Sequence, residues 1–257
     1  MKDQIQQQQP SFNIQKIDSV CDFTYVDETE STNKDAMAVA KNNGPHLTCI
    51  FSEKQTAGRG RRGRIWQTFP YKSIACSVVI HEGGSDMLPL LTSLVLANSI
   101  LEYTGIKTDI KWPNDLLIKN QKVAGILVES FKHQNKSVYI VGIGLNVNTP
   151  EESIDIPLTS LEEVRGKSID RAELLCIILQ NLKTALTIYS QQGWNTFKDD
   201  YIAKCITIGQ KVTWNNNGNP IEGIAEYMSD DGTICLLSND KTYQVRAGDI
   251  IAEGVAS

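Results

Sequence analysis

Three strand-like segments that follow one another with only short polar turns between them constrain the fold more than any other feature of this chain. They cover residues 108–112, 123–131 and 138–147. Runs of strands, with helices placed elsewhere in the chain, are typical of an α+β domain. We therefore expect a mixed β-sheet flanked by helices.

The flanking segments supply the remaining strands and helices of this sheet domain. Apolar or alternating patterns predict strands at 23–28, 48–54 and 73–80. Capping residues and glycine stops predict four helices. They begin at Ser31–Asn33 (ending near Gly44), at Ser85–Asp86 (ending at Gly105), at Asp170 (ending near Gln191) and at Trp194 (ending at Lys204).

The pattern changes after Cys205, where short strand-like segments alternate with glycine and asparagine turns. Regularly spaced short strands with turn signals predict a small β-barrel of about 50 residues. The first eleven residues are polar and rich in glutamine, so we expect a disordered tail there. The expected domains are therefore a tail at 1–11, a larger domain at 12–205 and a barrel at 206–257.

Charge and cysteine usage exclude several classes of function. The formal net charge is −5, so no global positive field is available for nucleic-acid phosphates. The six cysteines form no C-x-x-C pair and no cluster with histidine, which indicates reduced thiols rather than a metal site. Neither a signal peptide nor a membrane-spanning run is visible. We expect a cytoplasmic protein that binds neither nucleic acid nor membrane.

A glycine- and arginine-rich stretch, QTAGRGRRGRIW at 55–66, contains the spacing G-x-G-x-x-G at Gly58, Gly60 and Gly63. In a dinucleotide-binding fold the third glycine opens a helix whose N-terminus holds the pyrophosphate. Here the chain continues into a strand instead. A dinucleotide site is therefore not expected, whereas a solvated basic loop and a contact to single-stranded nucleic acid stay open as alternatives.

The same stretch has the features of an anion-binding loop. Glycines let backbone N–H groups approach a ligand, and guanidinium groups bind phosphate or carboxylate through paired hydrogen bonds. Trp66 adds an aromatic face on which a base can stack. We expect a loop that is mobile when empty and ordered by an anionic ligand. Its guanidinium groups belong to Arg59, Arg61, Arg62 and Arg64.

Two further segments bring opposite charges together. KWPNDLLI (111–118) places Asn114 and Asp115 after a strand, although proline, asparagine and aspartate are also ordinary turn residues. Lys122 then begins KVAGILVES, a strand with Gly125 in its interior, where glycine permits close approach to the backbone. Asp115 could hold Mg²⁺ or accept a proton from an amine, and Lys122 could stabilise negative charge on phosphate. This pairing suits acyl activation.

Taken together, these segments resemble the biotin protein ligase family. The resemblance is strong over residues 23–148 and looser in the C-terminal barrel. It rests on the order and spacing of ESTN (30–33), QTAGRGRRGRIW (55–66), KWPNDLLI (111–118), KVAGILVES (122–130) and GIGLNVN (142–148).

The resemblance implies a fold related to lipoate ligases and class II aminoacyl-tRNA synthetases, with an SH3-like C-terminal barrel. It also implies a two-step reaction. The carboxylate of biotin attacks the α-phosphate of MgATP to give biotinyl-5′-adenylate, and a lysine of a biotin carboxyl carrier protein or domain then displaces AMP. Such a reaction requires alignment, neutralisation of phosphate charge and protection from water.

The resemblance further assigns site residues, with residues 12–205 as the catalytic domain. Lys122 and Arg61 would be catalytic, and the charge pairing described above adds Asp115 as a catalytic residue and as the ligand of Mg²⁺. Biotin would contact Ser31, Thr32, Asn33, Gln55, Gly58, Arg59, Arg61, Lys122, Gly125 and Leu127. The nucleotide would contact Arg59, Arg61, Arg64, Trp66, Asn114, Lys122, Asn146 and Arg246.

The chain departs from the bifunctional members of this family, which carry an N-terminal helix-turn-helix repressor domain. Only about 20 residues precede its first expected strand, too few for such a domain. We therefore expect a monofunctional ligase, either a monomer or a homodimer. A lipoate ligase or a lipoyl or octanoyl transferase is the alternative enzyme, and a regulator that binds biotinyl-adenylate is the alternative without catalysis.

Overall fold

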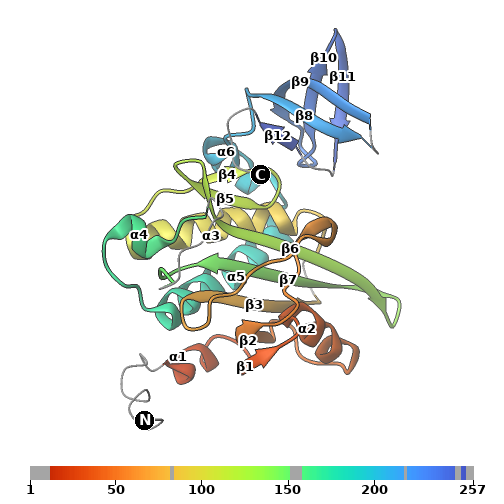
Figure 1. The fold of residues 1–257 in the computed structure, drawn as a ribbon. Helices are drawn as coiled ribbons and strands as arrows, with labels where there is room; N and C mark the ends of the chain where they lie inside the picture. The colour runs from red at the N-terminus through yellow and green to blue at the C-terminus, as the bar shows by residue number, and fades with distance from the viewer. Residues whose placement is uncertain (1–11, 82–83, 151–157, 217–218, 247–249, 253–257) are drawn as a thin grey trace.

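The computed structural model describes residues 12–81, 84–150, 158–216, 219–246 and 250–252. The expected tail at 1–11 lies outside these residues. The described chain forms two β-sheets with helices around the larger one (Figure 1). None of the helices in these ranges is long and apolar enough to cross a membrane.

The larger sheet has seven strands in the order β1-β2-β3-β7-β6-β5-β4. Only the pair β1–β2 is parallel, so the sheet is mixed, as predicted. The strands are β1 (Phe23–Thr29), β2 (Cys49–Gln55), β3 (Ser73–Ile80), β4 (Asp109–Lys111), β5 (Asp115–Ile118), β6 (Gln121–His133) and β7 (Lys136–Asn146).

Helices cover both faces of this sheet. On one face α2 (Thr32–Lys41) packs Ala36 and Ala40 against Ile50, Val79 and Ile140. The larger apolar core lies on the other face, beneath α3 (Leu88–Thr104) and α5 (Arg171–Gln192) (Figure 1). The remaining helices are α1 (Ile14–Asp18), α4 (Leu161–Arg165) and α6 (Asn195–Lys204).

Of two predicted helix starts, the structure confirms one and contradicts the other. Asp170 caps α5 as expected, because its Oδ1 accepts hydrogen bonds from the backbone N–H groups of Ala172 and Glu173. The predicted start at Ser85–Asp86 was wrong. The Ser85 hydroxyl accepts a bond from the N–H of Met87, and this turn delays α3 until Leu88.

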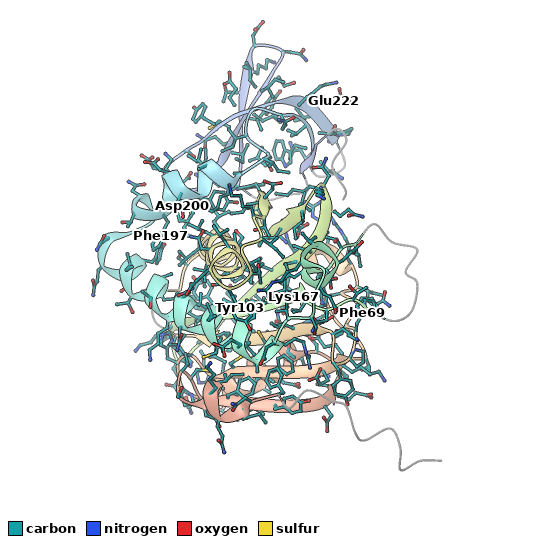
Figure 2. The ribbon with its side chains drawn as sticks, turned by 90° about the vertical axis from the view of Figure 1, so that its left-hand side faces the viewer. Phe69, Tyr103, Lys167, Phe197, Asp200 and Glu222 are labelled. Carbon is teal, nitrogen blue, oxygen red and sulfur yellow. The ribbon has the colours of Figure 1, made fainter. Side chains whose placement is uncertain are left out.

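The C-terminal part forms a five-stranded antiparallel sheet, in the order β11-β10-β9-β8-β12. It lies at one end of the larger sheet, and Figure 2 shows it with Glu222 on its outer part and Asp200 on the neighbouring helix α6. Its strands are β8 (Lys211–Asn216), β9 (Asn219–Met228), β10 (Ile234–Ser238), β11 (Lys241–Val245) and β12 (Ile250–Ala252).

Trp112 joins the two sheets. Its indole Nε1 donates to the carbonyl of Gly232 at 3.1 Å, and its backbone N–H donates to the Thr207 hydroxyl at 3.0 Å. Its side chain is almost wholly buried. The backbone N–H of Ile206 adds a bond to the carbonyl of Ile110 in β4. The KWPND segment therefore provides a buried contact between the larger sheet and the C-terminal part of the chain.

Candidate functional site

A cavity of about 680 Å³ opens over strands β6 and β7. All but two of the predicted site residues line it, and the exceptions are Gly58 and Arg246. The segments that meet here are far apart in the sequence, from the β1–α2 turn to the end of β7. The predicted residues on its wall are Ser31, Thr32, Asn33, Gln55, Arg59, Arg61, Arg64, Trp66, Asn114, Asp115, Lys122, Gly125, Leu127 and Asn146.

Glycines of β7 form the floor of the cavity. A Cβ atom on Gly144 would lie 2.3 Å from Cε2 of Trp66, and one on Gly142 would lie 2.2 Å from Oδ1 of Asn33. Both distances are far shorter than a van der Waals contact, so any larger residue would displace these side chains. Neither glycine was among the predicted site residues, although their spacing of two residues places them on one face of a strand.

The β1–α2 turn forms a polar and uncharged wall. The backbone N–H of Thr32 donates to Oε1 of Gln55 at 2.9 Å, and its hydroxyl lies 2.7 Å from the hydroxyl of Ser77. Ser77 in turn donates to Oδ1 of Asn33 at 2.6 Å. Ser31 occupies the cap position of α2 without making a side-chain cap bond, which corrects the expectation of N-cap chemistry there. Ser31 faces the cavity instead.

The glycine- and arginine-rich stretch folds into a tight hairpin. The backbone N–H of Gly60 donates to the carbonyl of Arg64 at 2.7 Å, and that of Trp66 donates to the carbonyl of Gly58 at 3.0 Å. A short 3₁₀ turn at Arg61–Gly63 forms its tip, and no α-helix follows before β3. The context that a dinucleotide-binding fold needs is therefore absent, as predicted.

Two arginines of the hairpin reach across the cavity. Arg59 donates from Nη2 to Oε2 of Glu129 at 2.7 Å, and Arg61 donates from Nη1 to Oδ1 of Asn114 at 2.5 Å. Gly58 lies at the hairpin base, where a Cβ would approach the carbonyl oxygen of Trp66 to 2.3 Å. Gly58 thus shapes the hairpin without lining the cavity.

Lys122 and Asp115 meet at the mouth of the cavity, as the sequence predicted. The distance from Nζ of Lys122 to Oδ1 of Asp115 is 2.8 Å. Asn114 donates to the same carboxylate oxygen at 3.0 Å, and β5–β6 pairing sets Asp115 opposite Gly125. The ammonium also lies 5.9 Å from the centre of the Trp66 ring. An ammonium, a carboxylate and an aromatic face therefore converge within one wall.

Two polar atoms on this wall are buried without a hydrogen-bond partner, namely Nε1 of Trp66 and Oδ1 of Asn146. Buried polar groups are almost always paired, because an unpaired one costs about 1–3 kcal/mol. Both side chains line the cavity. A ligand with a complementary acceptor and donor would satisfy both atoms.

Comparison with known proteins shows which family this chain belongs to. Residues 23–148 match the model of the biotin/lipoate A/B protein ligase family. The bifunctional ligase/repressor BirA of Bacillus subtilis is 33% identical over 236 residues, which are 88% of this chain and 72% of that protein. The chain belongs to the biotin protein ligase family.

Two further relatives agree with this membership. The biotin–[acetyl-CoA-carboxylase] ligase of Mycobacterium tuberculosis is 31% identical over 88% of this chain and 87% of its own length. The structure of a biotin protein ligase from Aquifex aeolicus in complex with biotin and ATP superposes with a TM-score of 0.78. It is 27% identical and covers 90% of this chain and 97% of that one.

A second cavity, of about 560 Å³, adjoins the first in this family member. Arg61, Trp112 and Asn114 line both cavities. The second also borders on the first residues of α3 and on Arg246, whose Nη2 lies 3.6 Å from Oδ2 of Asp231. Arg246 therefore faces the second cavity from the C-terminal part of the chain and shares its lining with the predicted residues Arg61 and Asn114.

Sequence reasoning missed two residues that bind the walls of the ligase site together, Ser77 and Glu129. Ser77 lies on β3 and links Thr32 to Asn33 through its hydroxyl. Glu129 lies on β6 and accepts bonds from Asn33 and Arg59. Ser77 lies in no motif, and Glu129 lies within the KVAGILVES motif but received no role, so contacts to distant segments reveal what both residues do.

Among the described residues, no group of three histidine, cysteine, aspartate or glutamate side chains could hold a metal ion. Asp115 offers a single carboxylate, already bonded to Lys122 and Asn114. Mg²⁺ in nucleotide sites is held by one or two carboxylates together with substrate phosphates. One carboxylate is therefore enough only for an ion that arrives on a triphosphate.

Proposed function

We propose that this chain is an ATP-dependent biotin protein ligase that forms biotinyl-5′-adenylate and transfers biotin to a specific lysine of a biotin carboxyl carrier protein or domain. The observation that carries the proposal is the polarity of the first cavity. One wall holds neutral hydrogen-bonding groups and the other holds the Lys122–Asp115 pair and the arginine hairpin. Biotin has the matching shape, with a neutral ureido ring at one end and a carboxylate at the other.

The neutral wall would hold the ureido ring. This ring needs an acceptor for its N–H groups and donors for its carbonyl, and hydroxyl and amide groups supply both. The floor at Gly125 and Leu127 gives the apolar part of biotin access to the strand backbone. The neutral wall consists of Ser31, Thr32, Asn33 and Gln55.

The charged wall would align the two reacting groups. A carboxylate oxygen of biotin attacks the α-phosphorus of ATP, and the bond to the bridging oxygen breaks to release pyrophosphate. Lys122, Arg59 and Arg61 would stabilise the negative charge that moves across these oxygens, and such electrostatic stabilisation is a large part of catalysis at a closed site. The hairpin would keep water from the adenylate.

In the second step the amine of the carrier lysine attacks the acyl carbon, and AMP leaves with the electrons of the acyl–phosphate bond. The attacking amine loses one proton. Asp115 would accept this proton, because it is the carboxylate that lines the cavity beside Lys122. No covalent enzyme intermediate is required.

The nucleotide would extend past Lys122. Trp66 and Asn146 carry the two unpartnered polar atoms, which suit the donor and acceptor groups of adenine. Arg64 and Asn114 line the same wall, and Arg246 would reach the phosphates from the second cavity. Mg²⁺ bound to the triphosphate would neutralise part of its charge, with Asp115 as the protein ligand.

The domain division and cellular setting complete the proposal. Residues 12–205 form the catalytic domain and residues 206–257 an SH3-like barrel, in a fold related to class II aminoacyl-tRNA synthetases. The enzyme is cytoplasmic, acts as a monomer or homodimer and binds neither nucleic acid nor membrane. The antiparallel C-terminal sheet supports the barrel, and the net charge of −5 supports the absence of a nucleic-acid partner.

Pyrophosphate release tests this function directly. The pure protein is incubated with ATP and either biotin or lipoate, and we expect release with biotin only. Release with lipoate alone would establish the alternative enzyme. Lys122→Ala should remain folded by circular dichroism and lose at least about a hundredfold in rate, because a charge that contacts the transferring phosphate contributes several kcal/mol. A folded variant with a near-normal rate would remove Lys122 from the mechanism.

A further inference from the structure

One carboxylate oxygen holds two walls of the cavity together. Oε2 of Glu129 accepts a hydrogen bond from Nδ2 of Asn33 at 2.8 Å and one from Nη2 of Arg59 at 2.7 Å. Asn33 lies in the first turn of α2, on the neutral wall, and Arg59 lies in the hairpin. Every second residue of a strand lies on the same face, so Glu129 lies on the same face of β6 as Gly125 and Leu127, which line the cavity.

This arrangement differs from the surface ion pairs of the same protein. In the pair Lys54–Glu28 the side chains are 51% and 55% exposed, and such pairs contribute little. The Glu129 side chain is 26% exposed; of its two partners, Arg59 is 45% exposed and Asn33 only 4%, so the burial lies on the side of Glu129 and Asn33. Its two donors come from segments that are 96 and 70 positions away in the sequence. The bonds of Glu129 therefore fix tertiary geometry.

The orientation of Asn33 depends on Glu129. Its Oδ1 accepts from Ser77, and its Nδ2 donates to Glu129, so the two ends of the amide are held by different strands. Without the carboxylate, the amide keeps only the Ser77 bond and a long contact of 3.4 Å to the carbonyl of Leu127. Glu129 thus sets which groups of the neutral wall face a ligand.

The direction of Arg59 depends on the same oxygen. A guanidinium carries five N–H donors in a rigid plane, so one charge-assisted bond at Nη2 orients the group without using the other donors. In this position Arg59 lines the cavity. The hairpin that carries Arg59 is closed by its own backbone bonds between residues 58 and 66, so fixing this side chain also fixes the hairpin over the cavity.

We propose that Glu129 is a positioning residue that couples the neutral, ligand-recognising turn to the arginine hairpin, so that recognition of the ureido ring and retention of the adenylate depend on each other. This inference rests on the proposed ligase function, which it extends to a residue that touches neither substrate.

Two variants of Glu129 separate the effect of its bond to Asn33 from the effect of its bond to Arg59. Glu129→Gln keeps an acceptor for Asn33 and removes the charge that holds Arg59. We expect its KM for biotin to stay within about twofold, while the dissociation rate of biotinyl-adenylate rises about tenfold, because a bond between charged groups is replaced by a neutral one. Glu129→Ala removes both bonds, so both quantities should rise. Glu28→Gln, which breaks a surface pair, is the matched control and should change neither.

Trypsin supplies a readout that needs no substrate. The hairpin carries cleavage sites after each of its arginines, and the cleavage rate reports how often the hairpin opens. Glu129→Gln should be cut there about tenfold faster than the protein with native Glu129, with unchanged circular dichroism. In Arg59→Ala the effect of Glu129→Gln should vanish, because their bond is already absent.

The outcomes distinguish a failure of the proposed ligase function from a failure of the proposed role of Glu129. If the unmodified protein releases no pyrophosphate with biotin, the ligase function fails, whatever the trypsin rates are. If it is active while Glu129→Gln and Glu129→Ala match it in adenylate dissociation and in hairpin cleavage, the function stands and the role of Glu129 is refuted. Equal effects of Glu129→Gln and Glu28→Gln would also refute it, because a general charge effect would then suffice.

Discussion

A buried ion pair behind the site gives the sharpest test of how the fold is stabilised. Arg171 of α5 donates to both carboxylate oxygens of Glu53, at 2.7 and 2.9 Å, and to the carbonyl of Ser73 at 2.8 Å. Glu53 also accepts from the Tyr25 hydroxyl at 2.9 Å and from the N–H of Tyr71 at 2.8 Å. Burial, together with the bond to Glu53, raises the pKa of Tyr25, so its hydroxyl remains a donor.

The perturbation is Arg171→Met, which keeps much of the side-chain volume. It removes three hydrogen bonds and leaves a carboxylate whose side chain is only 2% exposed without its cation. Removing one partner of a buried pair destabilises a protein by about 3–5 kcal/mol. The Arg171 guanidinium also lies 5.5 Å from the Phe12 ring, and methionine retains apolar contact there. We therefore expect a loss of about 3–4 kcal/mol.

Urea unfolding, followed by circular dichroism, measures this loss, and the double variant Arg171→Met/Glu53→Gln is its control. The double variant has no buried charge, so it should recover about 1–3 kcal/mol relative to Arg171→Met alone. The reasoning is refuted if Arg171→Met loses less than about 1 kcal/mol, or if the double variant is no more stable than the single one.

Three further outcomes are expected. Arg61→Gly should release adenylate about ten- to a hundredfold faster, since one charge-assisted bond is lost. The measurement is the amount of biotin that becomes attached to an unrelated lysine-rich protein in the same mixture. Gly144→Ala should displace the Trp66 indole, which a Cβ would approach to 2.3 Å, and raise the KM for ATP while its thermal midpoint stays within a few degrees. Hydrogen bonds to the Asp231 carboxylate, first from the side chain of Ser229 and then from that of Thr233, lower its pKa from 3.8 to about 2. Its stabilisation is present above pH 3.8 and lost as pH falls towards 2, so Asp231→Asn should flatten stability against pH there, by less than about 1 kcal/mol.

The sequence predicted most elements of the fold, and the ones it missed are short. Strand β3 and helix α5 were placed within a residue or two, because an apolar run and a capping aspartate mark them. Strand β5 was missed, because its four residues follow Pro113 and Asn114, which favour a turn. Helices α1 and α4 span five residues each, which is too short for a helical period to be visible.

Some contacts of the candidate site could also be predicted from the sequence, and others could not. Lys122 and Asp115 could be paired in advance, because one short turn returns the chain to the neighbouring strand. The bond between Arg59 and Glu129 could not, because a hairpin and a distant strand meet only in the folded state. The contacts by which one residue orients another form only in the folded state, so the KVAGILVES motif contains Glu129 without revealing its bond to Arg59.

The KWPND segment shows why the C-terminal sheet belongs to the argument about the site. Trp112 bonds to Gly232 in the turn before β10, while Asn114 and Asp115, two and three residues later, bond to Arg61 and Lys122. Arg246 faces the second cavity from the same sheet. A displacement of that sheet would therefore move Trp112 and the ion pair beside it together. One short segment thus links the position of the C-terminal sheet to the geometry of the charged wall.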